Sequence, residues 1–290
     1  MGGRVSQDFL RLVAVEDTTF TFTFQQNVRT QQFDYVEYST DNGTTWTKIQ
    51  NIDNTLVSAT TPTILQGNSL YVKGKGITLI NNLNNSLISS SGVFDAEGDV
   101  MSILGSEEFE STTYALRCLF KGSKVRKANN LILSASVMQP RCYHQLFYGC
   151  TNLTDAPIIS YTSAATACCY EMFRNCTSLV NTQDRLPDLL ADDCFHGLYN
   201  GCTSLVNAPV LPATSLAANS YGYMFQSCTS LKYIKCMALT DITASTSYTY
   251  WWVFGVPSGG TFVKNSAATW ENTFNRSSIP EGWTVITEDS

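Results

Sequence analysis

The sequence predicts an α+β protein, in which a small N-terminal β-sandwich precedes a solenoid of 26-residue repeats. Two observations predict it. Residues 8–90 alternate apolar and polar positions between turn signals, which is typical of short antiparallel strands. Further along, an aromatic residue and a Cys-Thr-(Ser/Asn)-Leu string return every 26 residues, a period typical of units that bury their apolar faces only by stacking. We therefore expect an anchoring β-sandwich at 1–90, the solenoid at 91–265 and a C-terminal cap at 266–290.

The first strands are predicted from alternation and from one turn. Residues 18–24 alternate Thr with Phe, the pattern of a half-buried strand. Asn42-Gly43 separates the strand-like runs 35–38 and 44–49, and this dipeptide is a strong hairpin signal. Further strands are expected at 56–59 and 69–73.

The repeats are predicted to combine a helical half with an extended half. Cys142, Leu146 and Cys150 fall at helical spacing, and the leucine that follows each such segment starts a short strand. Residues 100–104 and 130–133 are expected to be strands, 119–123 an early copy of the repeat, and 261–264 part of the last coil. Four columns stand in register: Cys150, Cys176, Cys202 and Cys228; Leu153, Leu179, Leu205 and Leu231; Phe147, Phe173, Tyr199 and Phe225; Leu146, Met172, Leu198 and Met224.

Composition excludes several classes of function. The net charge is -6, and charged residues make up 14% of the chain, so no basic surface for nucleic acid is expected. No apolar run approaches the length of a membrane span, and the first residues do not resemble a secretory signal peptide. Seven of the ten cysteines recur at the repeat period, in the columns Cys142, Cys168 and Cys194 and Cys150, Cys176, Cys202 and Cys228, and the cysteines are interpreted as small buried apolar residues with free thiols.

Motifs that resemble catalytic or metal sites have structural interpretations. Residues 39–46 match the Asp-box of sialidase propellers, but a single copy indicates a hairpin. His144 and His196 lie two repeats apart, roughly 10 Å at strand spacing, which is too far to share a metal ion. We therefore expect no enzyme activity, no catalytic residue, no metal and no cofactor. The carboxylates are expected to form a solvated face: Glu107, Glu108, Glu110, Asp184, Asp188, Asp192 and Asp193. Six tyrosines are proposed to line a glycan or protein surface, with ladder positions in the core as the alternative for half or more of them: Tyr161, Tyr199, Tyr221, Tyr223, Tyr248 and Tyr250.

Three segments resemble the BspA-like leucine-rich repeat group found in gut bacteria and their phages: Tyr170–Leu179, Gly201–Thr214 and Tyr223–Leu231. The stretches Asp8–Phe24 and Tyr38–Trp46 also resemble the start of proteins from these sources. The resemblance implies a right-handed leucine-rich repeat solenoid behind a β-domain, with adhesion or virion-surface roles and no catalytic residues.

The expected function is that of a non-enzymatic phage virion protein, a head, tail-fibre or decoration component, whose repeat surface serves attachment. The alternative is a bacterial cell-surface BspA-like adhesin, and a remote one is a glycan-active enzyme. Expected partners are other virion proteins or a host surface protein or glycan, without nucleic acid or membrane insertion. The sequence leaves the binding residues and homo-oligomerisation open.

Overall fold

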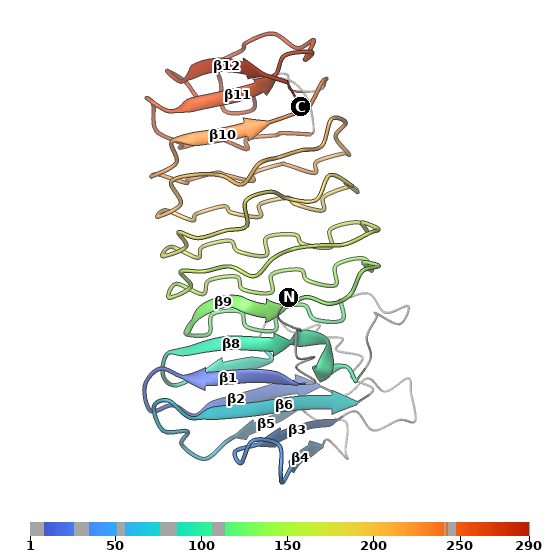
Figure 1. Ribbon diagram of the computed structural model, residues 1–290, viewed down its shortest axis with the longest axis vertical. Coiled ribbons are helices and arrows are strands. Elements are labelled where there is room, and N and C mark those ends of the chain that lie inside the picture. The colour runs from blue at the N-terminus through green and yellow to red at the C-terminus, as the bar shows by residue number, and fades with distance from the viewer. Residues whose placement is uncertain are drawn as a thin grey trace, which may run out of the picture.

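The protein is nearly all β over the residues that the structure describes, with 2% of them in helix and 29% in strand. The computed structural model describes residues 9–25, 35–50, 56–75, 86–105, 114–240, 242 and 248–289. Two sheets lie at one end of the long axis, turn-rich layers follow, and a third sheet lies at the other end (Figure 1). Elements in the N-terminal half are β1 (Leu10–Ala14), β2 (Phe20–Gln25), β3 (Tyr35–Ser39), β4 (Thr47–Gln50), β5 (Leu56–Thr60), β6 (Ser69–Lys75), β7 (Ile88–Ser90), β8 (Phe94–Asp99), η1 (Val100–Ile103) and β9 (Val125–Ile132).

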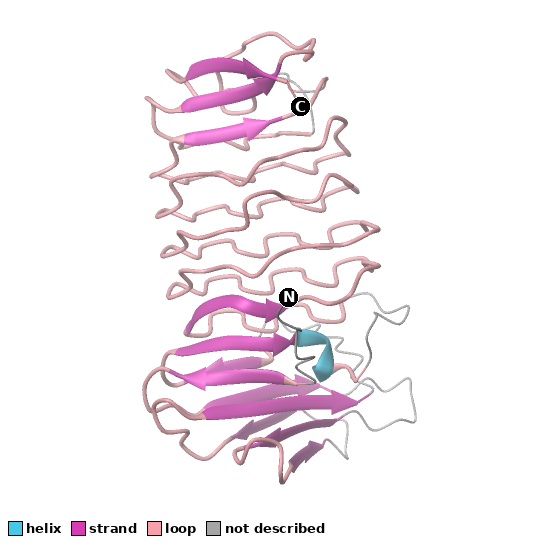
Figure 2. Ribbon diagram, in the orientation of Figure 1, coloured by secondary structure: helices cyan, strands magenta, loops and turns pink. Residues whose placement is uncertain are grey.

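The predicted α+β fold with a right-handed leucine-rich repeat solenoid is wrong. The sheets are mixed, and the short 3-10 helix η1 is the only helix in the described part of the chain. It lies at 100–103, where the sequence predicted a strand. The segments predicted to be the helical halves of the repeats contain consecutive turns instead, which Figure 2 draws as loop.

The two N-terminal sheets pack face to face. One has the order β4-β3-β6-β1-β8-β9 and the other β5-β2-β7. Phe20 and Phe22 of β2 reach across, and their rings lie 5.0 Å from Phe94 and 6.4 Å from Tyr38 of the larger sheet. Because alternate side chains of a strand point to opposite faces, Phe20 and Phe22 enter the core while Thr21 and Thr23 point to the other face. The strands predicted from alternation at 18–24, 35–38, 56–59 and 69–73 are confirmed, with shifts at their ends.

The predicted hairpin is confirmed, because β3 pairs antiparallel with β4 through Tyr38 and Thr47. Asn42 and Gly43 have φ angles of 59° and 82°. The carboxylate of Asp41 accepts hydrogen bonds from the Thr45 backbone N–H at 2.8 Å and the Thr45 hydroxyl at 2.6 Å. These bonds and one from Ser39 hold the pKa of Asp41 down at about 2. The Asp-box residues therefore stabilise the turn.

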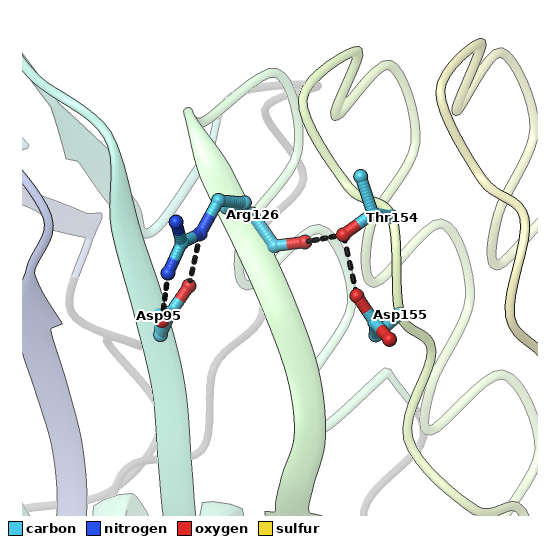
Figure 3. Close-up of polar contacts among 4 residues, drawn as sticks. All are labelled: Asp95, Arg126, Thr154 and Asp155. Atoms are coloured by element: carbon cyan, nitrogen blue, oxygen red, sulfur yellow. Dashed lines mark hydrogen bonds and ion pairs between the residues drawn. The ribbon is translucent and has the colours of Figure 1, made fainter.

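The larger sheet continues into the repeat region. β8 pairs with β1 on one edge and parallel with β9 on the other, so hydrogen bonding crosses residue 90 without a break. Figure 3 shows the junction, where the Arg126 guanidinium donates to both carboxylate oxygens of Asp95 at 3.0 and 2.6 Å. The Arg126 carbonyl accepts from the Thr154 N–H at 2.8 Å, and the Thr154 hydroxyl lies between that carbonyl and the Asp155 carboxylate. This series of hydrogen bonds joins the larger sheet to the first layers of the repeat region.

We call each 26-residue layer a rung. Within the turns of a rung, N–H groups alternate between two kinds of partner. The N–H groups of His144 and Leu146 close tight turns onto the carbonyls of Arg141 and Tyr143, at 3.3 and 3.2 Å. Every second N–H instead donates to the next rung, as Phe147 does to the Met172 carbonyl at 2.9 Å. The backbone N–H and C=O groups thus find hydrogen-bond partners without a helix or a continuous strand.

Every fourth residue of these turns has a positive φ. Arg141, Gln145 and Gly149 have values of 59°, 56° and 72° in one rung. A left-handed residue every four positions forms a chain of turns with a period of four, close to the 3.6 of an α-helix. Apolar residues four positions apart, such as Cys142, Leu146 and Cys150, therefore fit both an α-helix and this chain of turns. The equivalent left-handed residues of later rungs are Ala167, Glu171 and Asn175; Asp193, Gly197 and Gly201; Asn219, Tyr223 and Ser227.

Stacked aromatic rings form the axis of the core. The Phe147 and Phe173 rings lie 5.6 Å apart and nearly parallel, and Phe173 and Tyr199 repeat that distance. All three side chains are buried, and the predicted leucine column is buried beside them. The full set, in order along the axis, is Phe94, Phe120, Phe147, Phe173, Tyr199, Phe225 and Trp252.

Four of the cysteines form a second column: Cys150, Cys176, Cys202 and Cys228. All ten cysteines of the chain are free and buried. The thiols of Cys176 and Cys202 donate to the carbonyls of Phe147 and Phe173, each at 3.1 Å. Burial raises the pKa of Cys150 and Cys228 to about 12. These four thiols therefore link neighbouring rungs as neutral hydrogen-bond donors.

The far end of the stack is a parallel sheet of order β10-β11-β12, made of Tyr233–Cys236, Thr261–Asn265 and Thr284–Glu288. Two buried tryptophans fasten it, since Trp270 Nε1 donates to the Ala238 carbonyl at 2.9 Å and Trp283 Nε1 to the Pro257 carbonyl at 2.7 Å. β12 therefore extends the stack by one more strand.

Candidate binding surface

The outward side of the turn segments forms the candidate site, which we call the turn face. In the turn at 142–145 two side chains point inward and two outward: Cys142 and Tyr143 are buried, whereas His144 and Gln145 are half-buried. Successive rungs place their outward side chains in columns. The turn face consists of Tyr114, Arg117, Lys121, Arg141, His144, Tyr148, Tyr170, Arg174, His196, Tyr223, Tyr250, Trp251, Phe254 and Arg276.

A row of stacked rings runs along the turn face. The His144 ring lies 4.9 Å from the Tyr170 ring, which lies 4.4 Å from the His196 ring, and both pairs are within 11° of parallel. In the next rung Gly222 occupies this column, and a Cβ there would come within 2.9 Å of the His196 ring. Tyr223 covers His196 instead, at 5.1 Å and 55°. The row is therefore continuous over four rungs.

The end of the turn face nearest the N-terminal sheets is basic. Arg117 and Arg141 both lie over the ring of Tyr114, at 5.3 and 5.2 Å. Arg141 also donates a hydrogen bond to the Tyr114 hydroxyl. Beside them is a cavity of about 430 Å³, whose lining includes these three residues, His144 and Tyr170.

The opposite end is aromatic. Tyr250 and Phe254 are 43% and 44% exposed. Trp251 lies between them, with ring distances of 5.5 and 5.2 Å, and the Arg276 guanidinium covers it at 4.4 Å. Aromatic rings that are held rigid and partly exposed give contact area at low entropic cost, as binding surfaces require.

Burial keeps the histidines of the row neutral. It lowers the pKa of His144 to about 3, helped by the positive charges of Arg117 and Arg141. Burial also lowers the pKa of His196, against the opposing effect of nearby carboxylates. Both rings therefore take part in stacking as uncharged groups.

Acid is expected to destabilise the fold through His144. The His144 imidazole is protonated below pH 6.5 in the unfolded state but only below about pH 3 in the folded state. The free energy of unfolding therefore falls as the pH falls through that window. At pH 5 the loss is roughly 2 kcal/mol. His144→Tyr, which copies Tyr170 of the same column, should keep the stacking and reduce the loss. Urea unfolding at pH 7.5 and pH 5 gives the loss of unfolding free energy for the native protein and for the variant. Equal losses for the two proteins would contradict the role given to His144.

The six tyrosines that were predicted to lie on the surface differ in how deeply the structure buries them. Tyr199 and Tyr221 are buried at 1% and 0% exposure, so their predicted surface role is wrong. Tyr161 and Tyr248 are half-buried and pack against the core, and the Tyr161 hydroxyl donates to the Leu189 carbonyl at 2.7 Å. Tyr223 and Tyr250 belong to the turn face. The sequence did not point to Tyr170, Trp251 or the arginines as site residues. The 26-residue spacing does place Tyr170 in one column with His144 and His196, so that residue could have been found.

The predicted carboxylates do not converge. Glu107, Glu108 and Glu110 lie outside the described residues. Asp188 is 3.9 Å from Arg185, and the Asp192 carboxylate accepts from the Ala218 N–H at 3.1 Å. Asp193 accepts from the Asn219 amide at 2.6 Å. Over the part of the chain that the structure describes, no three His, Cys, Asp or Glu side chains are grouped so as to hold a metal ion.

No described helix has the length and apolar character that crossing a bilayer requires. A scan against protein-family models, a search of curated proteins and a search of solved structures each found no match. The resemblance to the BspA-like group therefore remains a hypothesis based on the repeat motifs.

Proposed function

We propose that the protein is a non-enzymatic binding component of a phage virion, part of the head, a tail fibre or a decoration, that presents its turn face to a host-surface glycan or protein. The row of rings with a basic end and an aromatic end is the observation that supports it. Residues from successive rungs place these groups at fixed intervals on a rigid support, which limits the entropy lost on binding.

The cysteine column favours the virion over the alternative, a bacterial cell-surface adhesin. Ten buried free thiols, four of them bonded to backbone carbonyls of the preceding rung, suit a protein that folds in a reducing compartment. A virion protein folds in the host cytoplasm before assembly, whereas an exported adhesin meets oxidising conditions while its thiols are exposed.

Removing the aromatic end tests binding. The variant Tyr250→Ala/Phe254→Ala should lower binding to host cells at least tenfold, because each lost aromatic contact contributes about 1 kcal/mol or more. The control Ile158→Ala/Val206→Ala removes side chains that are 60% and 42% exposed but lie outside the turn face. Fluorescently labelled protein on host cells gives the measurement, and equal losses for the two variants would refute a specific role for the turn face.

Localisation is tested independently by mass spectrometry of gradient-purified virions and of washed host cell envelopes. The virion proposal expects the chain in the virion fraction at a fixed ratio to the capsid protein. Recovery from envelopes of uninfected cells would favour the adhesin instead.

A further inference from the structure

The cavity at the basic end of the turn face combines features that select a particular ligand. Its volume of about 430 Å³ is within the range of small-molecule sites. Residues from consecutive rungs line it: Tyr114 and Arg117, then Arg141 and His144, then Tyr170, and finally Asp193. The stacking of rungs therefore creates the cavity.

One side of the cavity attracts a negative charge. Arg117 and Arg141 lie over the same tyrosine ring, so two like charges are held close together. Among the described residues no carboxylate forms an ion pair with Arg141. A guanidinium presents paired N–H donors that match the two oxygens of a carboxylate.

The other side offers an acceptor and an apolar wall. Asp193 is half-exposed and accepts from Asn219 through one oxygen, so its carboxylate retains acceptor capacity for hydroxyl groups. Tyr170 is stacked between His144 and His196, so the edge of a fixed ring forms the wall. With His144 neutral, two guanidinium groups and one carboxylate give the described lining residues a net charge of +1.

We propose that this cavity binds a monoanionic sugar unit, whose carboxylate meets Arg141 and Arg117 while its hydroxyls donate to Asp193 and its ring lies against the edge of Tyr170. This inference deepens the proposed function and rests on it, because it names acidic glycan as the class recognised on the host surface. A phosphate monoester suits the cavity less well, since its second negative charge would face Asp193 without a further cation among the described lining residues.

Calorimetric titration with oligogalacturonate tests the ligand class, with the fully methyl-esterified oligosaccharide as the neutral control. The acidic form should bind, and the ester at least tenfold more weakly, because a charge-assisted hydrogen bond contributes about 1.5–3 kcal/mol. Inorganic phosphate serves as the competitor. Displacement of the sugar by millimolar phosphate would overturn the proposal in favour of a general anion site.

Arg141→Asn is the matched variant. Asn219 occupies the same column at a φ of 55°, close to the 59° of Arg141, so the substitution should not disturb the backbone. It should weaken oligogalacturonate binding at least tenfold, whereas Arg185→Asn, at a position outside the turn face, should leave it unchanged. Urea unfolding verifies that both variants remain folded.

Equal binding of the acidic and esterified sugars, or of the two arginine variants, would overturn the inference, as would a lack of binding by the native protein. Host-cell binding that depends on Tyr250 and Phe254 would survive all of these outcomes. The failure of the sugar site and the failure of the proposed function are therefore distinguishable.

Discussion

Deleting residues 177–202 is expected to leave a folded protein that is one rung shorter. The deletion joins Cys176 to Thr203 and restores the string Cys-Thr-Ser-Leu-Val-Asn at the junction. Phe173 would then stack on Phe225 in place of Tyr199, and each remaining N–H would find an equivalent carbonyl in the next rung. Circular dichroism should show cooperative unfolding, and the urea m-value should fall by about a tenth, in proportion to the surface lost.

The control deletes 13 residues, 177–189, and so removes half as much chain. It shifts the following rungs by half a period, which places turn segments opposite extended segments and breaks the aromatic and cysteine columns. This shorter deletion should abolish cooperative folding. If the 13-residue deletion folded as well as the 26-residue one, the 26-residue register would not be what holds the rungs together.

Phe173→Ala should destabilise the protein by about 3–5 kcal/mol. Phe173 is fully buried and stacks on rings both above and below, so its removal opens a cavity that neither neighbour can fill without leaving its own rung. Urea unfolding monitored by circular dichroism gives the change in free energy.

Val180→Ala is the control, because Val180 is 50% exposed and lies outside the aromatic column. It should change the free energy of unfolding by less than about 0.5 kcal/mol. A cost below 1 kcal/mol for Phe173→Ala would mean that the ring column contributes little to holding the rungs in register.

The sequence allowed the register to be predicted but not the backbone conformation. Phe147, Phe173 and Tyr199 were placed in one column from their spacing, and the structure stacks them. The helix prediction failed because an inward residue every fourth position fits both an α-helix and a chain of four-residue turns. Left-handed residues decide between the two, and here several are Arg, Gln or Glu, which carry no sequence signal for a positive φ.

The candidate site was predictable only in part. Spacing placed His144 and His196 in one column, and Tyr170 between them follows from the same count. The cavity was not predictable, because Arg117 precedes the first clean repeat and its approach to Arg141 depends on a ring they share. Tyr199 was assigned to the surface although its column partners are phenylalanines, a pattern that indicates the core.

The division of N–H groups between a rung and its neighbour also determines how the protein responds to mechanical force. The hydrogen bonds between rungs lie along the long axis, so tension applied at the two ends opens one interface at a time. Each opened rung frees 26 residues, which extend to about 90 Å. A stretched molecule would lengthen in equal steps and dissipate work at each one, while the unopened rungs kept their shape.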